Sequence, residues 1–135
     1  MKSTLLSNEN YKIGNDVIYL PNFEASLTAP FIRRVYTENE KEYCTSFSEP
    51  TLRYASTFAA KEAVYKVLKQ WDEELTLPWN KIAIERNKPG GKPAVTILIP
   101  KLSKFEIALS ISHDGAYIWA IALLKTKQNV HASTH

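Results

Sequence analysis

The sequence predicts an α+β fold in which one long helix packs on an antiparallel sheet, with small helices after the first strand. An apolar three- and four-residue spacing runs through about residues 51–72, and alternating or β-branched segments lie on both sides of it. The chain has 135 residues, 44% of them hydrophobic, which suits one globular domain with a buried core. We therefore expect a single domain over 1–135, with loose polar tails at 1–10 and 126–135.

The first strand is expected at 11–20, where apolar residues partly alternate and Pro21 would end the strand. Gly14 lies near its middle, a position that often marks a close approach of another backbone. One or two short helices, interrupted near Pro30, are expected before Tyr36. Thr37-Glu38-Asn39-Glu40 then fits a capping box that starts a short helix to about Phe47.

The long helix, expected at 51–72, has a continuous apolar face. That face is formed by Ala60, Ala63, Val64, Val67, Leu68 and Trp71. Glu62 and Lys66 fall almost opposite, about 200° and 240° around the helix from Ala60. The helix is therefore expected to bury one face and to present this charged pair on another.

Two strand pairs are expected after the helix. Residues 81–85 and 95–99 flank 87–93, which is dense in turn formers. Residues 107–112 and 117–124 flank His113-Asp114-Gly115, in which Asp-Gly favours a tight turn. The sequence thus predicts two hairpins for the sheet side of the fold.

Charge and cysteine content limit the function classes. The formal net charge is +3, and the Lys and Arg residues are scattered, so a basic nucleic-acid-binding module is a weak alternative. The one cysteine, Cys44, excludes an internal disulfide framework and suits an inert thiol in a reducing cytoplasm. No apolar run reaches the roughly 20 residues that span a bilayer, and residues 1–10 lack the apolar stretch of a signal peptide.

The chemically interesting residues each have an ordinary interpretation when taken singly. Asp16 fits a surface acid, His113 a hydrogen-bonded histidine beside a turn, and Lys92 a solvated loop tip. Glu62 and Lys66 fit a solvated i, i+4 ion pair worth about 0.3–0.5 kcal/mol. Composition and periodicity alone indicate only an α+β domain.

The order of four motifs is more specific. Gly14-Asn15-Asp16 is followed by Phe58-Ala59-Ala60-Lys61-Glu62-Ala63 with Lys66, then by Gly91-Lys92-Pro93 and Ile111-Ser112-His113. From about residue 13 to 123 this order resembles the phosphopantetheinyl transferase superfamily, in particular its short type, the holo-acyl-carrier-protein synthases. The resemblance implies transfer of 4′-phosphopantetheine from coenzyme A to a serine of an acyl carrier protein, with release of adenosine 3′,5′-bisphosphate.

The resemblance also implies a site. Asp16 and Glu62 would bind Mg²⁺ together with the coenzyme A diphosphate, which agrees with the preference of this ion for oxygen ligands and water. Lys66 would hold the transferred phosphate or help to remove the serine proton, although Glu62 or a metal-polarised water is an equally good base. His113 would approach the phosphates or adenosine end of coenzyme A. Lys61 and Lys92 would add phosphate contacts.

The chain departs from the family pattern at several positions. Tyr19 stands where another acid is frequent, and Thr57 stands where an arginine is common, with Arg53 one helical turn earlier. No Lys or Arg occurs at 21–30, so Arg33 and Arg34 are the candidate contacts for a carrier protein. These departures favour a specialised, pathway-specific carrier, and they leave a non-catalytic coenzyme A or carrier-protein binder as an alternative. The long members of the superfamily hold two such units in one chain, and this chain resembles one unit. The resemblance to the short type therefore implies self-association, as a homotrimer with sites at subunit interfaces.

Overall fold

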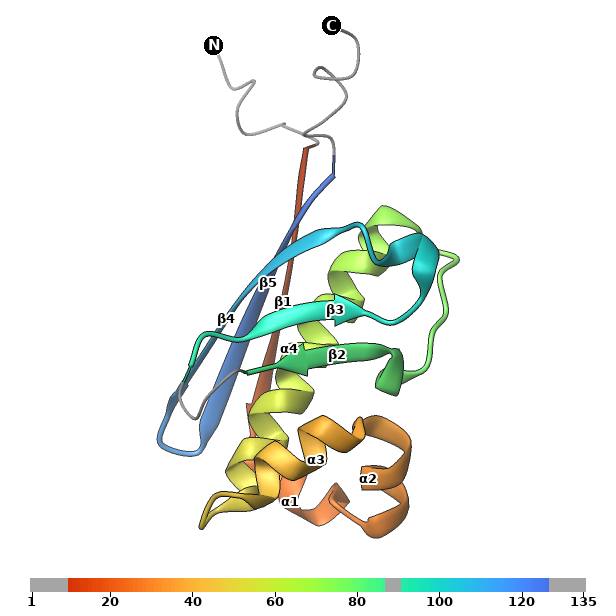
Figure 1. Cartoon of the computed structure of the whole chain (residues 1–135). Helices are drawn as coiled ribbons and strands as arrows, with labels where there is room; N and C mark the ends of the chain where they lie inside the picture. Colours follow the sequence, from red (N-terminus) through yellow and green to blue (C-terminus); the bar gives the residue numbers. More distant parts are fainter. Residues whose placement is uncertain (1–9, 87–90, 127–135) are drawn as a thin grey trace, which may run out of the picture.

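The computed structural model describes residues 10–86 and 91–126. In chain order the elements are β1 (Tyr11–Tyr19), α1 (Leu20–Ser26), α2 (Ala29–Val35), α3 (Glu38–Thr45), α4 (Pro50–Trp71), η1 (Trp79–Lys81), β2 (Ile82–Glu85), β3 (Ala94–Ile97), η2 (Pro100–Leu102), β4 (Glu106–Asp114) and β5 (Tyr117–Lys125). Figure 1 shows the long helix α4 beside the sheet, with the three small helices gathered at one end of it. The predicted fold class is confirmed.

The three long strands form an antiparallel sheet in the order β1-β5-β4, and β2 and β3 form a separate antiparallel pair. In the three-stranded sheet Asp16 pairs with Ala120, which pairs with Ile111. Both predicted hairpins are present. The prediction that His113 and Asp114 belong to a turn is wrong, because both residues continue β4 and the chain reverses at Gly115, whose φ is +59°.

α4 packs mainly on β1 and β5 and also contacts β2. The predicted apolar face is buried, with one exception at its end. Trp71 is 42% exposed, and its ring meets the Phe105 ring edge-on at 4.8 Å instead of entering the core. The rest of the face consists largely of small residues, which lets the helix backbone approach the sheet closely.

The short helices begin at prolines that the sequence analysis had expected to end or interrupt structure. Pro21 lies in the first turn of α1 and Pro30 in the first turn of α2. A proline fits there because the first amides of a helix have no partner within the helix. The predicted capping box is confirmed, with Thr37 and Glu40 each accepting a hydrogen bond from the other's backbone amide.

The sheet extends slightly beyond its strands, because the Thr126 amide donates to the Asn10 carbonyl at 2.7 Å. The predicted loose tails at 1–10 and 126–135 lie outside the described residues except for Asn10 and Thr126, which this hydrogen bond joins. Part of the predicted turn at 87–93 also lies outside them. Within the part of the chain that the structure describes, no helix is long and apolar enough to cross a membrane.

Candidate active site

Gly14 allows β1 and α4 to meet backbone against backbone. A Cβ atom at this position would lie 2.5 Å from the Ala63 carbonyl oxygen and 3.0 Å from the Val67 amide nitrogen. Asp16 is the next residue on the same face of β1, because strand side chains alternate. The close packing at Gly14 therefore brings Asp16 beside the flank of α4 that carries the charged pair expected from the sequence.

Lys66 links the helix to the strand. Its Nζ atom lies 2.9 Å from Asp16 Oδ1 and donates to the Asn15 carbonyl oxygen at 3.1 Å. The Asp16 side chain is only 10% exposed, whereas that of Lys66 is 53% exposed. Lys66 thus pairs with Asp16 on β1. Spacing alone suggested a solvated pair with Glu62 within the helix.

Asp16 and Glu62 form a carboxyl pair. Burial raises the pKa of Glu62 to about 7, and a hydrogen bond with Asp16 and the Asp16 charge act in the same direction, against the opposing charge of Lys66. Two carboxyl groups this close favour sharing a proton when no cation lies between them. The structure therefore brings Asp16, Glu62 and Lys66 together.

This oxygen-rich pair fits a magnesium ion. Mg²⁺ prefers oxygen ligands and commonly takes one or two protein carboxylates, completing its shell with water and substrate phosphate. Among the residues at 10–86 and 91–126, no group of three or more His, Cys, Asp or Glu side chains could hold a metal ion. An ion at this place would therefore depend on the two carboxylates and on ligands from outside the chain.

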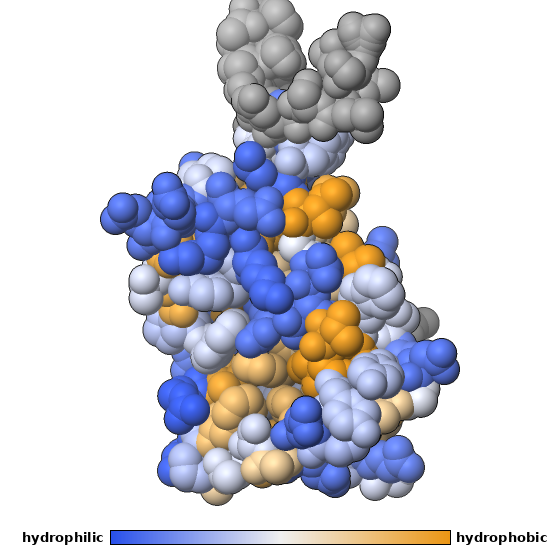
Figure 2. All heavy atoms as spheres, turned by 180° about the vertical axis from the view of Figure 1, so that it is seen from behind, coloured by the Kyte–Doolittle hydropathy of each residue, from blue (hydrophilic) through white to orange (hydrophobic). Residues whose placement is uncertain are grey.

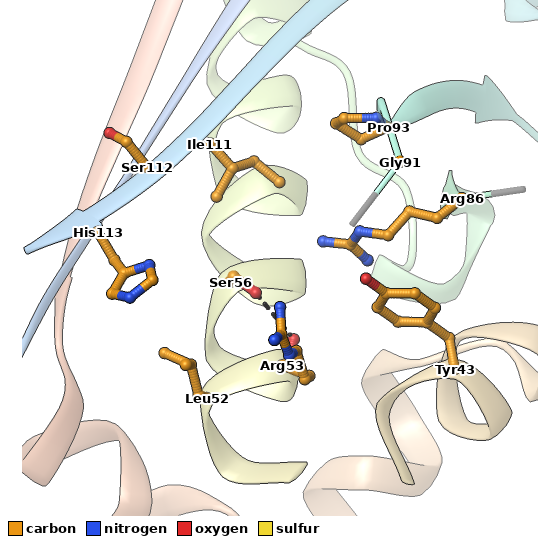
Figure 3. A pocket seen from close by; sticks show the side chains of 10 residues that line it. All are labelled: Tyr43, Leu52, Arg53, Ser56, Arg86, Gly91, Pro93, Ile111, Ser112 and His113. Atoms are coloured by element: carbon orange, nitrogen blue, oxygen red, sulfur yellow. Dashed lines mark hydrogen bonds between the residues drawn. The ribbon is translucent and has the colours of Figure 1, made fainter. Parts of the chain in front are cut away.

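A second group of polar side chains surrounds a pocket of about 160 Å³, shown in Figure 3. The pocket is lined by Tyr43, Leu52, Arg53, Ser56, Arg86, Gly91, Pro93, Ile111, Ser112 and His113. Two of the predicted binding residues, Arg53 and His113, line it. Lys92 does not, although both of its neighbours in sequence do.

The two groups lie on opposite sides of α4. β1 and β4 are the outer strands of the sheet, separated by β5, which places them about 10 Å apart. Asp16 lies on β1, whereas Ile111 and His113 line the pocket from β4. On the helix, Glu62 is about 240° around the axis from Ser56. Within one chain, the carboxyl pair and the pocket are therefore not brought together.

The prediction that Lys61 contacts phosphate is wrong. Its side chain is fully buried, and its Nζ atom lies 2.8 Å from Glu40 Oε1. The same ammonium group donates to the carbonyl oxygens of Trp79 at 3.0 Å and Ile82 at 2.6 Å. Glu40 Oε2 in turn accepts from the Ile84 amide at 2.7 Å. Lys61 thus joins α4 to α3, η1 and β2 inside the core.

Two residues of this region were missed by the sequence analysis. The pattern around Glu40 predicts only a capping residue, and nothing in it indicates an ion pair with Lys61, 21 positions later. Arg86 follows β2 directly, and nothing in its spacing indicates that its side chain reaches α4. Both depend on how separate elements pack, which local patterns do not report.

Comparison with known proteins shows the family of the chain. Residues 12–122 match the model of the 4′-phosphopantetheinyl transferase superfamily. The holo-[acyl-carrier-protein] synthase of Protochlamydia amoebophila is 36% identical over 117 residues, which cover 82% of this chain and 94% of that protein. The chain therefore belongs to the 4′-phosphopantetheinyl transferase superfamily and is of the holo-acyl-carrier-protein synthase type.

Solved structures give the same result. The complex of a Chronobacterium ammoniagenes ACPS with CoA superimposes with a TM-score of 0.75 and 26% identity, covering 89% of this chain and 100% of that one. A holo-(acyl-carrier-protein) synthase from Bacillus anthracis in complex with CoA (3′,5′-ADP) gives a TM-score of 0.69 and 28% identity, covering 85% and 96%. The similarity thus extends over nearly the whole of both chains.

Proposed function

We propose that this protein is a magnesium-dependent holo-acyl-carrier-protein synthase. It transfers 4′-phosphopantetheine from coenzyme A to a serine of an acyl carrier protein and releases adenosine 3′,5′-bisphosphate. The observation that carries the proposal is the convergence of Asp16 from β1 and Glu62 from α4, with Lys66 beside them. The names of the similar proteins, which are synthases of this type and include coenzyme A complexes, support the same reaction.

Each of the three residues has a role in this proposal. Asp16 and Glu62 hold Mg²⁺ together with oxygens of the coenzyme A diphosphate. The ion, when bound, supplies positive charge that stabilises the leaving bisphosphate. Lys66 orients Asp16 in the free protein, and its long, half-exposed side chain can turn to the transferred phosphate.

The outer face of the sheet supports an oligomer. The exposed side chains of the paired strands β1 and β5 are mostly large and apolar: Ile13, Val17, Tyr19, Tyr117, Trp119 and Ile121. Figure 2 shows the molecule from behind, and hydrophobic patches lie on the side where the sheet lies in Figure 1. A contiguous apolar face is uncommon on a monomeric protein. We therefore propose a homotrimer in which the carboxyl pair of one copy meets the His113 pocket of another.

Light scattering tests the assembly. We expect the mass of three chains, and a fully active monomer would overturn the homotrimer. The free, buried thiol of Cys44 suits the reducing cytoplasm that we propose as the location.

The proposed partner is an acyl carrier protein, which binds to Arg33 and Arg34. Both arginines are exposed in the last turn of α2, and α1 before them carries no basic residue in its last turn. An acidic surface of a carrier protein would pair with these exposed arginines. Because only two basic residues are available there, the electrostatic attraction to acidic carrier proteins in general is limited. The carrier is therefore proposed to be pathway-specific. Equal rates on a primary fatty-acid carrier and on a pathway-specific carrier would contradict this.

Mass spectrometry of the intact carrier protein tests the reaction. Apo-carrier is incubated with coenzyme A, Mg²⁺ and the protein, and we expect each carrier chain to gain one phosphopantetheine. Asp16→Ala and Glu62→Ala should abolish the gain, as should a chelator, whereas Glu42→Ala on the exposed side of α3 should not. If every member of a panel of apo-carriers stays unmodified while coenzyme A binds, the non-catalytic alternative is established. Wild-type rates in both site variants would overturn the site.

A further inference from the structure

One edge of β1 faces away from the rest of the sheet. β1 is an outer strand that pairs with β5, and just before it the Asn10 carbonyl oxygen accepts a hydrogen bond from the Thr126 amide. In an antiparallel pair the backbone groups of successive residues alternate in direction, so even-numbered residues of β1 bond to β5 and odd-numbered residues point away from it. The carbonyl oxygens of Ile13 and Asn15 therefore lie on the outer edge of β1.

Two side chains of α4 bind these two carbonyl groups. Gln70 Nε2 donates to the Ile13 carbonyl oxygen at 2.7 Å, and Lys66 Nζ donates to that of Asn15 at 3.1 Å. The spacing matches, because four residues of helix rise by about 6 Å and two residues of strand by about 6.7 Å. Between them, Gly14 lies in backbone contact with the same helix. Three consecutive residues of β1 are thus fixed to one flank of α4.

The contact made by Lys66 is temporary in the proposed reaction. The Lys66 ammonium group holds both the Asp16 carboxylate and the Asn15 carbonyl oxygen, and it must release them to bind the transferred phosphate. Gln70 is neutral and bonds to the strand one helical turn further along. Its hydrogen bond to Ile13 can therefore stay in place when Lys66 moves.

We propose that Gln70 is a positioning residue, which keeps β1, and with it Asp16, against α4 while Lys66 binds the transferred phosphate. The proposal rests on the proposed function, because that function assigns Asp16 to Mg²⁺ and Lys66 to the phosphate. Mg²⁺ demands near-ideal octahedral geometry, so a small displacement of one carboxylate weakens its binding. Gln70 acts on the reaction only through the position of Asp16.

Lys69 supplies a matched control on the same helix. Its Nζ atom donates to the carbonyl oxygens of Glu73 at 2.7 Å and Leu75 at 3.1 Å, which belong to the segment after α4. Lys69→Met therefore removes hydrogen bonds from α4 to backbone carbonyls while the bonds to β1 remain. Side chains also protect strand edges from pairing with other chains. A Gln70 that served only stability or edge protection would leave the Mg²⁺ requirement unchanged, as Lys69→Met should.

The Mg²⁺ dependence of transfer tests the proposal. Gln70→Met keeps the length of the side chain but loses the N–H donor. We expect half-maximal transfer to need about 3- to 10-fold more Mg²⁺, with kcat at saturating Mg²⁺ little changed. Gln70→Lys should largely restore the wild-type requirement, because it regains a donor even though its charge disfavours a nearby cation. An unchanged requirement in Gln70→Met, or an equal rise in Lys69→Met, overturns the proposal.

A binding measurement separates this proposal from the proposed function. With coenzyme A present, Mg²⁺ should raise the melting temperature of the wild-type protein above its value in a chelator. The rise should be smaller in Gln70→Met and unchanged in Lys69→Met. If the rises differ in this way but the wild type modifies no carrier protein, the reaction fails and the positioning of Asp16 by Gln70 stands. If the wild type and Gln70→Met show the same rise, the positioning role fails, whatever the activity.

Discussion

A Cβ atom added to Gly14 would lie 2.5 Å from the carbonyl oxygen of Ala63, so β1 and α4 touch through their backbones at this point. The contact fixes the height of the helix above the strand. Asp16 is two residues further along β1, and Glu62 immediately precedes Ala63. The distance between the two carboxyl groups is therefore set by a residue that has no side chain.

Gly14→Ala should reduce both stability and transfer. The added methyl group meets backbone, which cannot turn away as a side chain can, and overpacking of this kind costs about 1–3 kcal/mol. Chemical unfolding gives the free energy, and the carrier assay gives the rate. Asn22→Ala, at an exposed position of α1, serves as the control. A Gly14→Ala variant as stable and active as the wild type would show that α4 and β1 can separate at no cost.

The raised pKa of Glu62 should make the metal-free protein less stable as pH rises. The folded protein keeps this proton up to about pH 7, whereas the unfolded chain releases it near the ordinary value of 4.5. Between these values the folded state binds more protons, so stability falls with increasing pH and levels off above about 7. Melting temperatures in a chelator from pH 5 to 8 measure this.

Glu62→Gln should remove that part of the pH dependence, because the amide does not titrate. Its melting temperature should therefore fall less than that of the wild type over the same range. Glu42→Gln, exposed on α3, should follow the wild type. Parallel curves for Glu62→Gln and the wild type would contradict the shared proton.

The ion pair between Lys61 and Glu40 should dominate the stability of the helical end of the molecule. The two side chains are 0% and 1% exposed, so removal of one partner leaves a buried, unpaired charge. Glu40→Ala is expected to cost about 3–5 kcal/mol in the free energy of unfolding. The double variant Glu40→Leu with Lys61→Met should be clearly more stable than either single one. If the loss in the free energy of unfolding of the double variant equals the sum of the losses of the two single variants, the pairing is ruled out.

One introduced charge tests whether the apolar outer face of the sheet forms the subunit interface. Trp119 is 51% exposed and pairs with Val17 across the sheet. Trp119→Glu should leave the fold intact, because the side chain is half-exposed on the outer face of the sheet, but should convert the proposed trimer to monomers and abolish transfer. Ser110→Glu, on the less apolar β4 part of the same face, is the comparison and should weaken the assembly less. A Trp119→Glu protein that remains trimeric would show that the assembly uses another face.

Much of the fold follows from local patterns. The capping box at Thr37, the small apolar face of α4 and the hairpin signals each depend on residues close in sequence, and the structure confirms them. The predicted roles of Pro21 and Pro30 are wrong. A proline can end one element or begin the next, and only the packing decides which. Trp71 was assigned to the core because it continues the helical spacing, yet α4 ends there and the ring packs on Phe105.

The site was predicted less completely, for a physical reason. Asp16, Glu62 and Lys66 were identified through their motifs, and the structure brings these three together. Lys61 lies next to Glu62 in sequence, but one residue is about 100° of helix rotation, which directs the Lys61 side chain into the core. There it forms an ion pair with Glu40. Arg86 carries no motif at all, and its contacts arise only where β2, α3 and α4 meet.

In the proposed trimer, each reaction centre combines the carboxyl pair of one copy with the pocket of another. Glu62→Ala and His113→Ala should each be nearly inactive alone. When the two variants are co-expressed and mixed within one trimer, about a quarter of the wild-type transfer rate should return, because random pairing joins an intact half of each kind in a quarter of the interfaces. A mixture no more active than its separate components would place the whole site within one chain and contradict the account.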